Sequence, residues 1–177
     1  MSLGWSTTRL HIRPYQPADA EALVEAVRES LDSVGRWLPW CHPDYSLAEA
    51  LDWIAHCEQA IARGEAYDLG VFCRGSGQLL GSVAINQIRP TERTGNVGYW
   101  LRRSAQGRGL AREALAGIPA LGLDRLGLQR LEIVIALGNQ PSRRLAERCG
   151  AVFEAVAARR LPLHGEWVDA WIYSLPR

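Results

Sequence analysis

A short glycine-rich turn, Gln106-Gly107-Arg108-Gly109-Leu110-Ala111, joins an apolar strand to a helix in this sequence. Glycine lets several backbone N–H groups converge on one anion, and the N-terminus of the following helix adds its positive dipole end. The turn therefore predicts a pyrophosphate-binding loop. It lacks the lysine-containing pattern of nucleotide P-loops and the G-x-G-x-x-G pattern of dinucleotide sites. A strand–glycine–helix corner that binds nothing is the structural alternative.

Asn139 and Ser142 form a second polar pair, directly after the apolar run 130–137. Asn and Ser are among the residues that best cap a helix N-terminus, so capping a short helix that Gly150 ends is the structural interpretation of the pair. A functional interpretation depends on the family resemblance described below.

An aromatic loop, Trp37-Leu38-Pro39-Trp40, separates two amphipathic helices. Aromatic side chains on a loop stiffened by proline can wall a substrate pocket, so Trp37 and Trp40 are predicted to bind substrate. The alternative is that both cap the core, where we also expect Trp100. Arginines near the glycine-rich turn suit phosphate binding as a group, although each alone could be a solvated charge: Arg102, Arg103, Arg108 and Arg112.

The composition is that of an ordinary globular protein, with 177 residues, 47% hydrophobic residues and a net charge of +1. This charge gives no reason to expect nucleic acid or an anionic membrane as a partner. All 20 basic residues are arginine, which excludes a catalytic lysine. The four cysteines lack metal-site spacing, so no metal site is predicted. The N-terminus has no secretory signal pattern, and we expect a cytoplasmic protein.

Strands and helices alternate along the chain, which predicts one mixed α/β domain over residues 1–177. The strands are expected at 8–13, 67–73, 78–88, 97–102, 130–137, 152–162 and 166–175. The helices are expected at 17–34, 47–63, 110–126 and 139–149. Ser46 and Glu49 form a capping box before the second helix and Gly64 ends it. Pro119 should break or kink the third helix.

The two polar motifs together resemble the signatures of the GCN5-related N-acetyltransferases, the GNAT family. The turn matches the Gln-x-x-Gly-x-Ala loop, and Asn139-Gln140-Pro141-Ser142 matches Asn-x-x-Ser in the family's order. The segments 8–14, 37–40, 163–169 and 173–175 resemble the RimJ/RimL-type members, so the similarity covers nearly the whole chain. Gly150-Ala151 departs from the family's Gly-Phe step.

The resemblance implies an α/β (α+β) fold: one GNAT-type domain with a mixed, twisted and splayed sheet of about six or seven strands and about four helices. It also implies that acetyl-CoA lies in the opening of the sheet, with its pyrophosphate on the turn 106–111 and its pantetheine against Asn139. The strand before the turn usually bulges, and backbone N–H groups near Tyr99, Trp100 and Leu101 bind the pantetheine and the thioester.

Acetyl transfer to an amine requires a polarised carbonyl, a neutral nucleophile and a proton for the leaving thiolate. Since RimL-type enzymes place a serine at the Asn-x-x-Ser position, Ser142 is the predicted proton donor. The family's usual glutamate near position 96 is Asn96 here, and the RimL-like glutamate near Leu161 is also missing. Glu92 is the predicted base, ahead of the other carboxylates that could serve, which are Glu154, Glu166 and Asp169.

The lack of an evident base favours an acceptor that loses its proton easily. Deprotonation at pH 7 costs about 1 kcal/mol for an α-amine but about 4.6 kcal/mol for a lysine side chain. We therefore expect a protein N-terminal α-amine, of a ribosomal protein by resemblance. A small-molecule amine and a non-catalytic acyl-CoA-binding module are the alternatives, and homodimerisation is left open.

Overall fold

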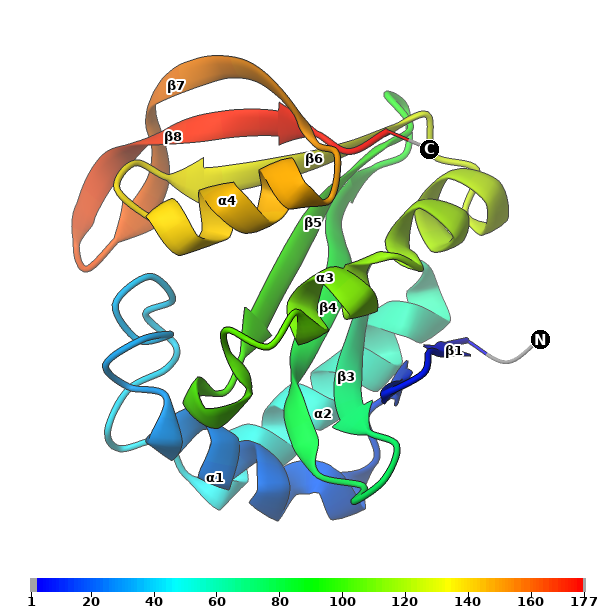
Figure 1. Ribbon diagram of the computed structural model, residues 1–177, viewed down its shortest axis with the longest axis vertical. Coiled ribbons are helices and arrows are strands. Elements are labelled where there is room, and N and C mark those ends of the chain that lie inside the picture. The colour runs from blue at the N-terminus through cyan, green and yellow to red at the C-terminus, as the bar shows by residue number, and fades with distance from the viewer. Residues whose placement is uncertain (1–2, 177) are drawn as a thin grey trace.

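The computed structural model describes residues 3–176, which form one eight-stranded sheet in the order β1-β2-β3-β4-β5-β6-β8-β7 (Figure 1). Neighbouring strands are antiparallel except β5 and β6, which are parallel. The strands are β1 (Trp5–Ser6), β2 (Leu10–Pro14), β3 (Tyr67–Cys73), β4 (Leu79–Arg89), β5 (Thr94–Leu101), β6 (Arg130–Ala136), β7 (Val152–Leu163) and β8 (Glu166–Ser174).

The α/β class and the mixed sheet are confirmed, and the sheet has eight strands where six or seven were predicted, seven of them by position. The additional strand is β1, whose two residues pair with Ile12 and His11 of β2. Two residues are too few to show the alternation of apolar and polar side chains that identifies a strand in a sequence.

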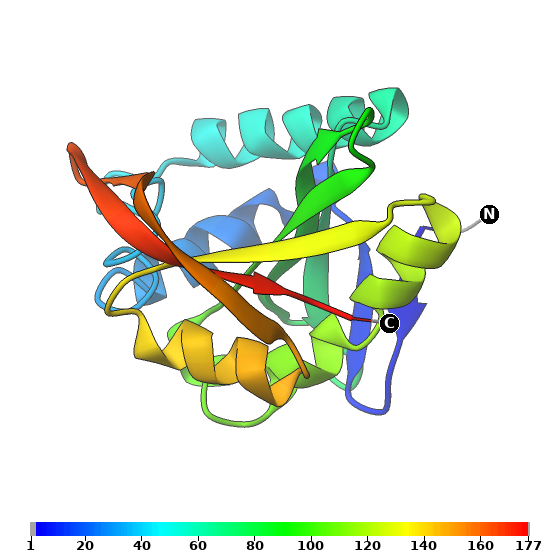
Figure 2. The same cartoon turned by 90° about the horizontal axis from the view of Figure 1, so that it is seen from above.

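Within residues 3–176, four α-helices cover the two faces of the sheet: α1 (Ala20–Glu29), α2 (Leu47–Arg63), α3 (Leu110–Leu115) and α4 (Gln140–Arg148). Figure 2 shows α1 and α2 on one side and α3 and α4 on the other. Each side has its own buried cluster. The α3/α4-side core includes Leu110, Ala146 and Tyr99, and the α1/α2-side core includes Leu23, Ile54 and, at its edge, Trp100.

The second helix follows its sequence signals closely. The Ser46 hydroxyl accepts a hydrogen bond from Glu49 N at 3.2 Å, the Glu49 carboxylate accepts one from Ser46 N at 2.9 Å, and Gly64 ends the helix at φ 70°. Pro119 also breaks the third helix as predicted, because α3 ends at Leu115 and a separate π-helical segment covers Ala120–Arg125.

The first helix is shorter than predicted. A 3-10 turn (Pro17–Asp19) precedes α1, which ends at Glu29 rather than near residue 34. At its end the Ser30 hydroxyl donates a hydrogen bond to Ala26 O at 2.6 Å and accepts one from Arg103 N at 3.1 Å. A serine that bonds backbone groups in this way competes with continued helix, so the chain turns here into the aromatic loop.

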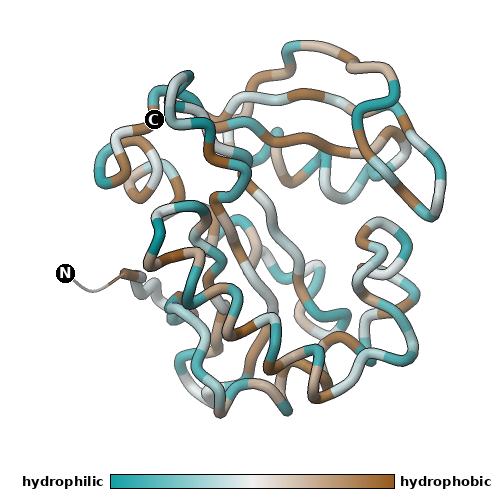
Figure 3. The backbone as a smooth tube through the Cα atoms, turned by 180° about the vertical axis from the view of Figure 1, so that it is seen from behind, coloured by the Kyte–Doolittle hydropathy of each residue, from teal (hydrophilic) through white to brown (hydrophobic). Residues whose placement is uncertain are grey.

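Hydrophobic and hydrophilic segments are interspersed along the whole tube in Figure 3. In β3, Leu69 and Val71 lie in the α3/α4-side core while Phe72 lies in the α1/α2-side core. Neighbouring side chains of the strand therefore point to opposite faces of the sheet. Among residues 3–176, no helix has the length and hydropathy needed to cross a bilayer.

Candidate functional site

The central opening of the sheet lies between β5 and β6. The two strands pair only at Thr94↔Arg130, Gly95↔Leu131 and Asn96↔Glu132, although β5 continues to Leu101 and β6 to Ala136. Figure 1 shows them diverging toward their C-terminal ends. Beyond Asn96 the β6-facing edge of β5 therefore has backbone groups without a ladder partner, and such groups require other partners.

The direction of these backbone groups follows from the ladder with β4. Arg102 N donates to Leu80 O at 2.8 Å, so it points toward β4. Because N–H groups alternate sides along a strand, those of Tyr99 and Leu101 point into the opening. Trp100 is the register partner of Ser82, and its N–H faces β4. Of the three predicted backbone contacts to the cofactor, the geometry supports Tyr99 and Leu101 but not Trp100.

The bulge that the family resemblance implied for β5 is not present. The register between β4 and β5 runs without a shift from Gly81↔Leu101 to Asn86↔Asn96. The irregularity lies instead after Asn86, next to Gln87, which has a φ of 46°. The free N–H groups of β5 thus arise from its divergence from β6 and not from a bulge.

The predicted pyrophosphate loop lies at the end of β5. Gly107 and Gly109 have φ values of 73° and 74°, conformations that favour glycine. Gln106 donates through Nε2 to Leu101 O at 2.8 Å, which fixes the turn to the strand. Gly109 is the N-cap of α3 and no side chain caps this helix. The exposed backbone from Gly107 to Gly109 therefore remains accessible to an anion, whereas the Leu110 side chain is buried in the core.

Arg102 is not a phosphate ligand, contrary to the sequence-based interpretation. Its side chain is only 2% exposed and donates to Glu25 Oε1 at 2.6 Å, Glu29 Oε2 at 3.0 Å and Leu79 O at 3.1 Å. The same Glu29 carboxylate accepts a hydrogen bond from Ser104 N at 2.7 Å. These contacts lower the pKa of Glu29 to about 2 and hold the chain before the turn against α1.

The other arginines near the turn have exposed side chains: Arg103, Arg108 and Arg112. Arg103 lies 3.5 Å from the exposed carboxylate of Asp32, a contact that solvent weakens. Arg108 O accepts a hydrogen bond from the Arg9 guanidinium at 3.0 Å, which connects the turn to the N-terminal strands. These three guanidinium groups remain candidates for phosphate contacts.

Ser142 lies beside the opening on the α3/α4 side. Asn139 Oδ1 accepts a hydrogen bond from Ser142 N at 3.3 Å, so Asn139 does cap α4. Tyr99 reaches α4 from β5: its hydroxyl donates to Ser142 O at 3.1 Å and lies 3.0 Å from Ser142 Oγ. Burial raises the pKa of Tyr99, which therefore stays a neutral phenol. The Ser142 hydroxyl is thus held next to the strand whose N–H groups are free.

The aromatic loop lies across the wide end of the opening. The Trp40 and Trp100 rings meet edge to face at 5.4 Å. On the other side, a Cβ atom on Gly138 would lie 3.5 Å from Trp37, which places Trp37 beside the residue before Asn139. His164 Nε2, in the β7–β8 turn, is hydrogen-bonded to Arg36 O at 3.1 Å. The loop therefore connects β5, the end of β6 and the last hairpin, and Trp100 is only partly buried.

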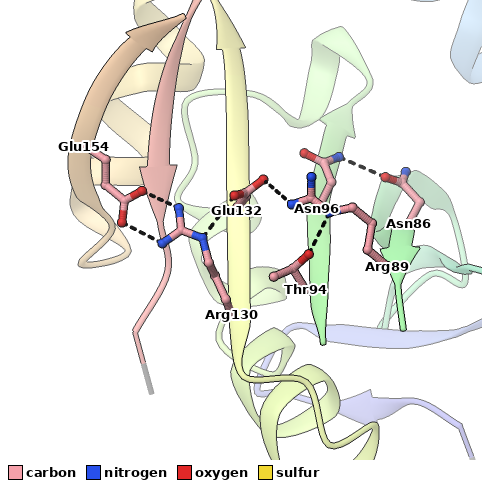
Figure 4. A network of polar contacts seen from close by, with 7 residues as sticks. All are labelled: Asn86, Arg89, Thr94, Asn96, Arg130, Glu132 and Glu154. Carbon is pink, nitrogen blue, oxygen red and sulfur yellow. Dashed lines mark hydrogen bonds and ion pairs between the residues drawn. The ribbon is translucent and has the colours of Figure 1, made fainter. Parts of the chain in front are cut away.

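A polar network occupies the narrow end of the opening, on the face opposite α3 and α4 (Figure 4). Asn96 Nδ2 donates to Asn86 Oδ1 at 2.9 Å, and the Glu132 carboxylate accepts from Arg130 Nε at 3.0 Å and Arg89 at 3.3 Å. A pocket of about 260 Å³ adjoins it, lined by Gln87, Ile88, Arg89, Gly95, Asn96, Glu132 and Arg160.

The structure does not bring the predicted base Glu92 to Ser142. Glu92 is exposed in the turn before β5, and Tyr99 lies seven residues further along. β5 begins at Thr94, so five residues of strand, roughly 17 Å at about 3.3 Å per residue, lie between the end of this turn and Tyr99. Two of the other carboxylates that could serve as the base already accept hydrogen bonds from neighbouring residues. Glu154 accepts one from Arg130 at 2.7 Å, and Asp169 accepts one from Arg159 N at 2.9 Å.

Glu132 is a carboxylate at the opening that sequence reasoning missed. It is the register partner of Asn96, in the last pair before β5 and β6 diverge, and its side chain is 18% exposed. Its neighbours Leu131 and Ile133 lie in the α3/α4-side core, so Glu132 faces the opposite side. A single ionisable residue within the apolar run LEIVIA was the available signal.

Comparison with known proteins agrees with this arrangement. Residues 9–152 match the family model described as the acetyltransferase (GNAT) domain. A Vibrio cholerae structure described as a "putative ribosomal-protein-serine acetyltransferase" is 34% identical, covers all of both chains and has a TM-score of 0.84. The ribosomal-protein-serine acetyltransferase of Escherichia coli is 29% identical over 97 residues, which are 55% of this chain and 54% of that protein.

A third comparison concerns the fold alone. The structure of RimL, a ribosomal L7/L12 α-N-protein acetyltransferase in complex with coenzyme A, is 24% identical and superposes with a TM-score of 0.86. The match covers 95% of this chain and 94% of that one.

Proposed function

The chain belongs to the GNAT acetyltransferase family, and we propose that it transfers the acetyl group of acetyl-CoA to the α-amine of a protein N-terminus. The observation that carries this proposal is the opening between β5 and β6. On the α3/α4 side it has Ser142 and the glycine-rich turn, and on the opposite face it has a polar pocket beside Glu132. Two reactants can thus meet there from opposite faces of the sheet.

The residues around the opening suit acetyl-CoA, which supplies the acetyl group as a thioester. The backbone of Gly107–Leu110 and the exposed arginines would hold the pyrophosphate, and Asn139 would contact the pantetheine. The N–H groups of Tyr99 and Leu101, which have no partner in the sheet, would donate to the thioester carbonyl. Fixed backbone donors of this kind stabilise the negative charge that develops on a carbonyl oxygen during acyl transfer.

Ser142 would donate a proton to the leaving sulfur. Tyr99 stays protonated, and either hydroxyl can be the donor in the 3.0 Å contact between Tyr99 and Ser142 Oγ. When Tyr99 donates to Ser142 Oγ, the hydrogen of Ser142 Oγ is available for another acceptor. Direct attack by the amine leaves a thiolate, whose pKa is about 8.5 for a free thiol. A hydrogen bond from a hydroxyl is sufficient to assist such a leaving group.

The acceptor would enter on the face of Asn96 and Glu132. Two arginine side chains donate to the Glu132 carboxylate in the structure. Glu132 would attract an incoming ammonium group at the entrance of this face, before the amine reaches the opening beside Tyr99. An α-amine then loses its proton at neutral pH at a cost of about 1 kcal/mol, without a strong base. Trp37 and Trp40 would border the acceptor chain, and relatives described as ribosomal-protein acetyltransferases support a protein acceptor.

The test is a thiol titration of CoA released from acetyl-CoA in the presence of different amines. Peptides with a free N-terminus should support release, and the same peptides with a blocked N-terminus should not. Release with polyamines or aminoglycosides alone would contradict the proposal in favour of a small-molecule acceptor. No release with any amine, although calorimetry shows acetyl-CoA bound, would contradict it in favour of a binding module.

A further inference from the structure

Arg160 lies at an irregular point of β7, beside the pocket of the proposed acceptor face. The register of β7 with β8 shifts between Ala157 and Leu161. Within this bulge Arg159 has a φ of 49°, and its N–H donates to Asp169 Oδ1 at 2.9 Å. Bulges redirect side chains and are frequent next to active sites. Here the Arg159 side chain is exposed, whereas the half-buried Arg160 lines the pocket.

The charges around this pocket do not balance. The Glu132 carboxylate accepts hydrogen bonds from Arg89 and Arg130. Both carboxylate oxygens of Glu154 accept hydrogen bonds from Arg130. The side chain of Arg160 has no ion pair or hydrogen bond with any residue from 3 to 176. Three guanidinium groups therefore stand against two carboxylates, and the unmatched positive charge is that of Arg160. A half-buried cation without a partner favours binding of an anion.

The position of the pocket sets the distance between this anion and the reacting amine. Gly95, Asn96 and Glu132 line the pocket at the last paired positions before β5 and β6 diverge. Tyr99 N, which points into the opening, is three residues further along β5, roughly 10 Å away. An extended peptide covers about the same distance in three residues, so its second, third or fourth side chain can reach the pocket while its N-terminus lies in the opening.

We propose that Arg160 binds a carboxylate side chain at position 2, 3 or 4 of the acceptor peptide, and so selects N-termini that carry an early Asp or Glu. The guanidinium group is suited to this role because its planar donors match the two oxygens of a carboxylate. The amide groups of Gln87 and Asn96 line the same pocket and can add neutral hydrogen bonds. This inference rests on the proposed function, because it assigns the acceptor of that same site.

The test compares octapeptides with a free N-terminus that carry Asp or Asn at position 2, 3 or 4. For the wild-type protein, Asp should raise kcat/KM about tenfold over Asn at one of these positions, the effect of one charge-assisted hydrogen bond. Arg160→Gln should remove this preference, and Arg160→Glu should reverse it toward Lys at the same position. Arg159→Gln is the matched control, because that neighbouring side chain does not line the pocket, and it should keep the wild-type preference.

Binding provides a second readout that does not require turnover. Calorimetry with the CoA-saturated protein should show weaker binding of the Asp peptide to Arg160→Gln than to wild type, with unchanged binding of the Asn peptide. Equal binding and equal kcat/KM of Asp and Asn peptides in the wild type would overturn the inference, as would a preference that survives in Arg160→Gln. If α-amine peptides bind as expected but none is acetylated, the proposed function fails while the anion subsite stands.

Discussion

Replacing Glu29 by Gln tests whether α1 holds the chain segment that precedes the glycine-rich turn. The Glu29 carboxylate accepts hydrogen bonds from the buried Arg102 side chain at 3.0 Å and from Ser104 N at 2.7 Å. The variant keeps the size of the side chain but removes its charge. Arg102 would then be left with one carboxylate, that of Glu25, whose side chain is 67% exposed. We expect lower stability and weaker binding of acetyl-CoA.

The magnitude follows from the pKa of Glu29, which Arg102 lowers from an ordinary value of 4.5 to about 2. At 1.36 kcal/mol per pKa unit, a change of this size corresponds to about 3.4 kcal/mol of folding free energy at pH 7. The side chain is 29% exposed, so solvent screening reduces this figure, and we expect a loss of about 2 kcal/mol.

The stability difference between wild type and Glu29→Gln should depend on pH. Because the pKa of Glu29 is lower in the folded protein, its contribution is fully present above pH 4.5 and is lost as the pH falls toward 2. Urea denaturation of wild type and Glu29→Gln should therefore differ most at pH 7 and progressively less below pH 4.5. Glu58→Gln, at an exposed position of α2, is the control and should differ little from wild type. Equal stability of Glu29→Gln and wild type at pH 7 would refute the reasoning.

Three further substitutions address the fold and the site. Burial raises the pKa of Asp68 to about 6 from 3.8, so the wild type loses stability as the pH rises from 3.8 to about 6, and the loss is complete above that pH. By urea denaturation, Asp68→Asn should be more stable than wild type by up to about 3 kcal/mol at pH 8 and equal to it below pH 3.8. Ser142→Ala should lower kcat at least ~10-fold while calorimetry shows an unchanged acetyl-CoA Kd. Gly107→Val places a β-branched residue at φ 73° and should raise that Kd at least ~5-fold, since such strain costs about 1–3 kcal/mol.

Local signals in the sequence predicted much of the fold. The capping box at Ser46 and Glu49, the C-terminal Gly64 and the break at Pro119 each depend on residues close in the chain, and the structure agrees with all three. The end of α1 was not predictable in this way. It depends on Ser30, which is bonded to Arg103 from a distant part of the chain. The sequence alone does not show that contact.

In the candidate site, too, features that depend on neighbouring residues were predictable and features that depend on tertiary contacts were not. The glycine-rich turn is a contiguous motif and was found, whereas Glu132 becomes notable only once the pairing of β6 with β5 places it opposite Asn96. Glu92 is close to Asn96 in the sequence, but it lies in the turn before β5, and the extended strand separates it from the opening. Arg102 looked like a phosphate ligand because its burial against α1 is a tertiary contact.

The most direct test of the central claim is the position of the acetyl group on a peptide that offers both kinds of amine. A peptide with a free N-terminus, an early Asp and one internal lysine would be incubated with acetyl-CoA and the protein, and the product mapped by tandem mass spectrometry. Our account predicts acetylation of the α-amine, strongly reduced in Ser142→Ala, with the lysine unmodified. Acetylation of the lysine side chain alone would contradict it.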